Sequence, residues 1–144
     1  MFKNILVPVS SEYFPKKAME KALELSKYFE ANVEVIYIIE EKVKDKIQKA
    51  SEYVRTDTQI EEIEEDINDA KKEEFNDAMK EWEDDFEDKV EFKTKIVKGK
   101  YSNEISEELK KYNADLILME TEQESILDYS LFYKEDKTPI MIVR

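Results

Sequence analysis

Four short apolar segments constrain the fold of this chain more than any other feature of its sequence. They are Ile5–Val9, Val33–Ile39, Leu116–Met119 and Ile140–Val143. Apolar runs of about four to eight residues are typical of strands that are buried on both faces of a parallel sheet. Pro8 is expected near the end of its strand, because it cannot donate a ladder hydrogen bond. The sequence therefore predicts an α/β fold in which helices connect parallel strands.

The segments between these runs supply the helices and one further strand. Apolar residues recur at helical spacing over about 14–30 and 105–112, and a shorter helix is predicted over 126–133. Residues 92–97 alternate between apolar and charged side chains, which is typical of a half-exposed edge strand. The prediction is a single domain over residues 1–144, with five strands and helices on both faces of the sheet.

The middle of the chain carries most of its charge. Residues 41–88 hold 19 acidic and 8 basic side chains, whereas the net charge of the whole chain is −13. An apolar stripe over 58–88 predicts an acidic helical region within the domain. It is either one long helix that overhangs the sheet or a helix broken near residues 71–74, where the stripe slips. Its acidic face is either a solvated surface or a docking surface for another protein, and the sequence leaves both interpretations open.

Composition excludes several classes of function. The net charge of −13 argues against nucleic acid or an anionic membrane as a partner, because phosphate groups attract Lys and Arg. The chain has no Cys and no His, which removes disulfides, thiolate metal sites and the commonest general base. A single glycine cannot build a glycine-rich phosphate loop. No apolar segment is long enough to span a membrane and no signal peptide is evident, so we expect a cytoplasmic protein.

Several segments, in order, resemble the universal stress protein family. The resemblance covers about 100 residues, all but the acidic middle, and it predicts a Rossmann-like, doubly wound sheet of five parallel strands. The implied strand order is 3-2-1-4-5, as in adenine nucleotide α-hydrolases. The segments that carry the resemblance are Met1–Val9, Ala18–Val35, Val97–Gly99 with Asn103–Ile105, Asn113–Met119 and Thr138–Arg144.

The family's ATP motif is missing from this sequence. The family pattern after strand 4 is glycine, two residues, glycine, nine residues, then glycine with serine or threonine. Glu120 and Gln123 stand at the first two glycine positions, and Ile126 and Leu127 stand where the last pair would be. Ser10 replaces the aspartate that follows strand 1 in nucleotide-binding members. Glycines let backbone N–H groups approach phosphate oxygens, so we expect the phosphate half of the site to be lost.

The loop after the fourth strand is acidic, which bears on both ATP and metal binding. Glu120, Glu122 and Glu124 would repel a triphosphate, since like charges about 4 Å apart cost on the order of 4 kcal/mol. The same carboxylates could chelate Mg²⁺, but no metal, ATP or other cofactor is assigned. By resemblance, a degenerate nucleotide cleft is assigned to Val9, Ser10, Ile38, Met119, Glu120 and Thr121.

No catalytic residue is assigned. Ser10 and Ser11 lack a histidine partner and are expected to cap the following helix. The last strand would leave an unprotected apolar edge, and the family commonly dimerises through this strand, so a homodimer interface is assigned to Ile140, Met141, Ile142 and Val143.

The leading hypothesis is a regulatory or protective module that does not bind ATP and acts through protein association. The alternatives are a small-ligand or residual adenine-nucleotide binder (AMP, adenosine or ATP), and a metal-assisted hydrolase that uses the Glu120 loop.

Overall fold

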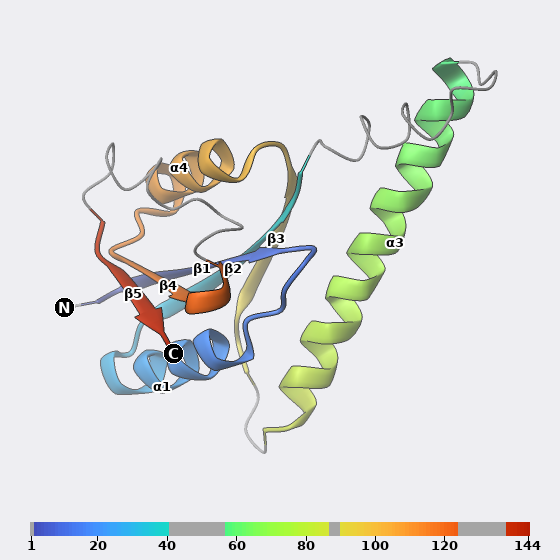
Figure 1. The fold of residues 1–144 in the computed structure, drawn as a ribbon. Helices are drawn as coiled ribbons and strands as arrows, with labels where there is room; N and C mark the ends of the chain where they lie inside the picture. Colours follow the sequence, from blue (N-terminus) through green and yellow to red (C-terminus); the bar gives the residue numbers. More distant parts are fainter. Residues whose placement is uncertain (1, 41–56, 87–89, 124–137) are drawn as a thin grey trace.

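The computed structural model describes residues 2–40, 57–86, 90–123 and 138–144. Its five strands form one parallel sheet in the order β3-β2-β1-β4-β5, which confirms the predicted fold class and strand order (Figure 1). The strands are β1 (Asn4–Ser10), β2 (Asn32–Ile39), β3 (Lys93–Lys98), β4 (Leu116–Glu120) and β5 (Ile140–Val143).

Helices cover both faces of this sheet, as predicted. Helices α1 (Lys16–Phe29) and α3 (Asp57–Asp84) lie on one face, and α4 (Tyr101–Tyr112) lies on the other (Figure 1). A short 3₁₀ turn, η1 (Thr121–Gln123), follows β4. The helix predicted over 126–133 falls outside the described residues. None of the described helices combines the length and the apolar character that crossing a membrane requires.

Alternation along the central strands builds two separate cores. In β1, the side chains of Ile5, Val7 and Val9 contribute to the core beneath α1 and α3. Leu6 contributes to the core beneath α4, together with Ile38 of β2. Both faces of a central strand are therefore buried, which explains why these strands are continuous apolar runs in the sequence.

Pro8 lies inside β1, two residues before the strand ends, at a point where its missing N–H does no harm. The carbonyl of Lys3 accepts a hydrogen bond from Asn32 N of β2, so alternate residues of β1 face β2 and the residues between them, Pro8 included, face β4. The pairing of β1 with β4 has already ended at Leu6 and Ile117. Pro8 therefore faces a gap in the ladder rather than a partner strand.

The chain's single glycine ends β3. Gly99 has a φ of +155°, which side-chain-bearing residues rarely adopt, and a Cβ at this position would overlap the carboxylate of Glu104. Its N–H still donates to Ile39 O of β2, 3.0 Å away. The turn into α4 therefore requires glycine.

Helix α3 is continuous, so the predicted alternative of a break near residues 71–74 is wrong. The second half of the helix packs on the sheet through Phe75, Met79 and Trp82, which are 3–4% exposed. Phe75 stacks on Tyr37 of β2 with ring centroids 4.5 Å apart. Seven residues before Phe75, and so on the same side of the helix, Asn68 also occupies a buried position. The first half extends beyond the sheet, which confirms the predicted overhang (Figure 1).

Candidate functional site

The strands β1 and β4 separate at their carboxyl ends. Their ladder stops at Leu6 and Ile117, but β1 continues to Ser10 and β4 continues to Glu120. Doubly wound sheets bind ligands in the crevice at this point, where the strand order reverses. Whether the residues assigned to the degenerate cleft can bind a nucleotide therefore depends on which side chains fill this crevice.

The carboxylate of Glu120 occupies the start of helix α1. Its Oε2 accepts hydrogen bonds from Lys17 N at 3.1 Å and from Ala18 N at 3.3 Å, and the residue is 1% exposed. The N-cap residue of α1 is Pro15, which makes no side-chain cap, and the first helical turn has no acidic residue. Glu120 thus supplies the cap and the negative charge that a helix N-terminus favours. The prediction that Ser10 and Ser11 cap this helix is wrong.

Gln123 closes the gap between the two strands. Its Oε1 accepts from Glu120 N at 2.9 Å, and its Nε2 donates to Pro8 O at 2.9 Å. The side chain is completely buried, and it satisfies two backbone groups that the ended ladder would leave unpaired. The sequence identified Gln123 only as a lost glycine. Pro8 was the one residue in the sequence that could have pointed to this role of Gln123. A proline inside the strand marks a gap in the ladder, so its carbonyl needs a donor from elsewhere in the chain.

Tyr13 was missed by the sequence analysis altogether. Tyr13 lies in the connection between β1 and α1. Its hydroxyl donates a hydrogen bond to Glu120 Oε1, 2.8 Å away. This hydrogen bond, together with burial and the charges of Glu120 and Glu122, raises the pKa of Tyr13 to about 12. Tyr13, Glu120 and Gln123 therefore form one hydrogen-bonded group that fills the crevice with the protein's own polar atoms.

The apolar residues assigned to the cleft do not share one wall. Val9 belongs to the core beneath α1 and α3, whereas Ile38 and Met119 belong to the core beneath α4, and each is at most 1% exposed.

Tyr101, at the start of α4, is part of the same cluster as Ile38 and Met119. Burial, with the charges of Glu40 and Glu12, raises the pKa of Tyr101 to about 12, against hydrogen bonds to Ser11 and Ser10 that lower it.

The two remaining assigned residues have local roles or none. Ser10 is buried, and its Oγ accepts a hydrogen bond from Glu12 N at 3.3 Å, which stabilises the turn after β1. Thr121 is exposed at the start of η1. Among the described residues, no group of three or more acidic side chains is arranged to hold a metal ion, and Glu124 lies outside them.

A second buried polar group lies under α4, away from the crevice. Glu108 of α4 is 5% exposed and forms an ion pair with Lys95 of β3, with 2.6 Å between Oε2 and Nζ. Glu34 of β2 is 1% exposed beside this pair. Burial and a hydrogen bond to Glu108 raise the pKa of Glu34 to about 7, so that Glu34 keeps its proton to a higher pH than Glu108 does. Burial would raise the pKa of Glu108 as well, but Lys95 lowers it below its usual value.

The last strand has a free edge in the described part of the chain. Strand β5 ends the sheet and pairs only with β4 there, and all four of its residues are half-buried. Met141 and Val143 pack against the core beneath α1, and Ile140 and Ile142 against the core beneath α4. The other edge strand, β3, carries alternating lysines, as predicted for residues 92–97.

Comparisons with known proteins agree with this architecture. A universal stress protein UspA from Lactobacillus plantarum superposes with a TM-score of 0.73 at 18% identity, over 99% of this chain and 98% of that one. A universal stress family protein from Burkholderia pseudomallei gives 0.66 at 17%, over 99% and 96%. A universal stress protein solved in complex with cAMP gives 0.58 at 15%, over 99% and 97%. These identities show the fold alone.

The search of curated proteins found no match. The model of the universal stress protein family matches residues 1–132, which is most of the chain and includes both sides of the crevice. This chain therefore belongs to the universal stress protein family.

Proposed function

We propose that this protein is a regulatory or protective module of the universal stress type that works without ATP, as a homodimer, by associating with other proteins. One observation carries the proposal: the Glu120 carboxylate already accepts from Lys17 N and Ala18 N. These are the free N–H groups at the helix terminus nearest the crevice, and a phosphate would need such donors.

Charge and space at the crevice support the same conclusion. A phosphate placed beside Glu120 would meet a buried carboxylate, and like charges about 4 Å apart cost on the order of 4 kcal/mol in a part-buried site. Gln123 fills the gap that glycine would leave open, and it is itself bonded to both strands. The residues present do not fit a nucleoside triphosphate. The proposed function therefore includes no reaction of ATP, and no catalytic residue is assigned.

The homodimer is supported by the exposed edge of β5. Its backbone groups that face away from β4 have no partner strand in the described part of the chain, and its apolar side chains are only half-buried. Pairing with β5 of a second copy would satisfy both and would give a closed twofold assembly.

Calorimetric titration with ATP and Mg²⁺, up to about 1 mM, tests the central claim. We expect no saturable binding by the wild-type chain. The double variant Glu120→Gly, Gln123→Gly is the informative comparison, because it restores both glycine positions. One-to-one binding of ATP to the wild type in the micromolar range would contradict the proposal.

A residual adenine-nucleotide binder is the second candidate. It is supported by the similarly folded universal stress protein solved in complex with cAMP. The same titration with AMP, adenosine and cAMP separates the candidates, since these ligands carry one phosphate or none. Binding of adenosine and AMP but not ATP would favour a small-ligand function over the leading proposal.

A further inference from the structure

A second recess lies beside the β1–α1 connection, and Tyr13 of the Glu120 group forms part of its lining. It is a cleft of about 190 Å³ between this connection, the end of β2 and the middle of α3. The volume is comparable with cavities of roughly 150 Å³ that admit a benzene-sized ligand. The ligand that it fits is therefore a small group rather than a nucleotide.

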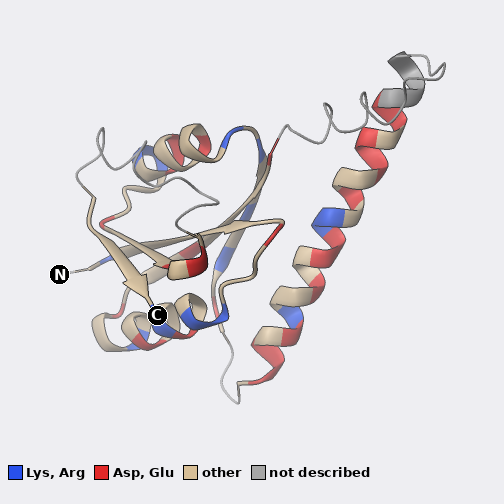
Figure 2. Ribbon diagram, in the orientation of Figure 1, with Lys and Arg blue, Asp and Glu red and all other residues tan. Residues whose placement is uncertain are grey.

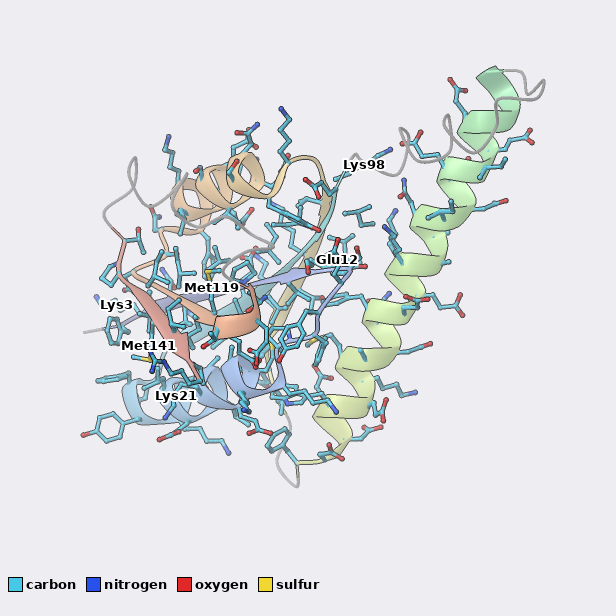
Figure 3. The ribbon with its side chains drawn as sticks, in the orientation of Figure 1. Lys3, Glu12, Lys21, Lys98, Met119 and Met141 are labelled. Atoms are coloured by element: carbon cyan, nitrogen blue, oxygen red, sulfur yellow. The ribbon has the colours of Figure 1, made fainter. Side chains whose placement is uncertain are left out.

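The lining of this cleft combines two carboxylates with aromatic rings. Glu12 comes from the β1–α1 connection and Glu74 from α3, so acidic side chains line it from two separate elements. Figure 3 shows Glu12 on the side of the connection that faces α3. The aromatic side chains of Tyr13 and Phe14 also line it, beside the stacked rings of Tyr37 and Phe75. No Lys or Arg is among the described residues that line the cleft.

Negative charge gathers around the cleft, because both of the charged residues that line it are acidic. Burial raises the pKa of Tyr37 to about 12, and the charge of Glu74 adds to this rise, against a hydrogen bond to Ser11 that lowers it. Helix α3 bears 13 acidic and 3 basic residues, and Figure 2 shows this charge along its length. A field of this sign attracts cations from solution and opposes anions.

The combination selects one class of ligand. An anion would be repelled by both carboxylates, and a neutral apolar group would leave their charges without a partner. A metal ion needs several oxygen ligands close together, and no such group occurs among the described residues. An organic cation satisfies both features, because carboxylates pair with its charge and the aromatic faces outside the Tyr37–Phe75 stack attract it.

We propose that the cleft between Glu12 and Glu74 binds the guanidinium or alkylammonium group of an organic cation. This inference goes beyond the proposed function, since it depends on neither the missing ATP site nor the dimer. The cation is supplied by a free amine or by an arginine or lysine side chain of a partner, and the recognition chemistry is the same.

Calorimetry on the full chain with agmatine, which carries both kinds of group, tests the proposal at constant ionic strength. Butylurea serves as the uncharged comparison and a short arginine peptide as the protein-like one. We expect saturable one-to-one binding of agmatine and none of butylurea. Glu12→Gln and Glu74→Gln should each weaken binding roughly five- to tenfold, as expected for one charge-assisted contact.

Glu73→Gln is the matched control, because it removes the same charge from the neighbouring position of α3, which does not line the cleft. It should change the affinity for agmatine less than about twofold, because a charge outside the cleft acts on the ligand only at long range and salt screens that interaction. An equal loss in Glu73→Gln, equal binding of butylurea, or no saturation by either agmatine or the arginine peptide would each overturn the proposal. Binding of the peptide without agmatine would assign the cation to a protein partner, and the reverse result to a free amine.

Discussion

Glu120 connects two parts of the chain that are far apart in sequence. Glu120→Gln keeps the shape of the side chain but removes the charge that caps α1. We expect the free energy of unfolding to fall by about 1–2 kcal/mol, the usual size of a helix-cap contribution. We also expect the pKa of Tyr13 to fall from about 12 towards its ordinary value of 10.0. Urea unfolding and an NMR titration of the tyrosines measure the two effects.

Glu122→Gln is the control for this prediction, because Glu122 lies on the same short turn but is exposed, whereas the hydrogen bonds from Lys17 N and Ala18 N go to Glu120. It should leave the unfolding free energy within about 0.5 kcal/mol of the wild type. Equal effects of the two substitutions would show that Glu120 acts only through its charge in solvent and not as a cap.

The carboxyl of Glu34 makes stability depend on pH. Its pKa rises on folding from 4.5 to about 7, so its protonated form is favoured in the native state. Its contribution is therefore complete below about pH 4.5 and is lost as the pH rises towards about 7. Glu34→Gln mimics the protonated form, so we expect it to stabilise the protein at pH 8 by roughly 1–2 kcal/mol and to flatten the dependence between the two pKa values.

Urea midpoints measured across this pH range test the prediction. Glu20→Gln, at an exposed position of α1, is the control and should leave the pH profile unchanged. A loss of stability in Glu34→Gln at pH 8 would mean that the native state needs the ionised carboxylate, contrary to the cause given above.

At the scale of elements, α3 is held by a few apolar anchors. Phe75 is 3% exposed and stacks on Tyr37, so Phe75→Ala removes a ring from the middle of the contact. We expect unfolding to cost about 3–5 kcal/mol less, as for other buried aromatic residues. Chemical denaturation followed by the fluorescence of Trp82 measures this. Asn76→Ala, on the exposed face of the same helix, should change stability little, and comparable losses would mean that α3 is not anchored through its apolar stripe.

Strand β5 offers a sharper test of the proposed dimer. Ile117 N donates to Pro139 O, so Met141 and Val143 face β4 and the N–H of Ile142 faces outward. Ile142→Pro removes an outward donor without breaking the ladder to β4, and light scattering coupled to size exclusion should show a monomer.

Thr94→Pro is the matched control at the opposite edge of the sheet. Thr94 is exposed on β3, and its N–H also faces away from the neighbouring strand. This variant should remain a dimer. A wild-type chain that is monomeric at all concentrations, or an unchanged dimer in Ile142→Pro, would contradict pairing through β5.

For the whole molecule, the net charge of −13 should destabilise the compact state through self-repulsion. Added salt screens this repulsion, with a Debye length that falls from about 30 Å at 0.01 M to about 8 Å at 0.15 M. We therefore expect the midpoint of thermal unfolding to rise by roughly 2–4 °C over this range. A midpoint that falls with salt would show that favourable ion pairs, such as Lys98–Glu64, outweigh the repulsion.

Most of the architecture was determined locally by the sequence. The apolar runs of β1, β2, β4 and β5 specify strands buried on both faces. This property can be read from the local sequence, because a strand that is apolar at every position has no side that favours solvent. The order of the strands came from resemblance to the family. The single glycine marked the turn after β3, where a Cβ would overlap Glu104.

Only the tertiary structure decided what the residues after β4 do. The sequence showed that Glu120 and Gln123 replace glycines, and it predicted repulsion of phosphate. It could not show that Glu120 accepts from Lys17 N and Ala18 N, because those contacts join residues more than 100 positions apart. The same holds for the cleft between Glu12 and Glu74, since its walls meet only when α3 packs on the sheet. Local patterns specify which elements form, whereas packing of distant elements decides which polar groups face one another.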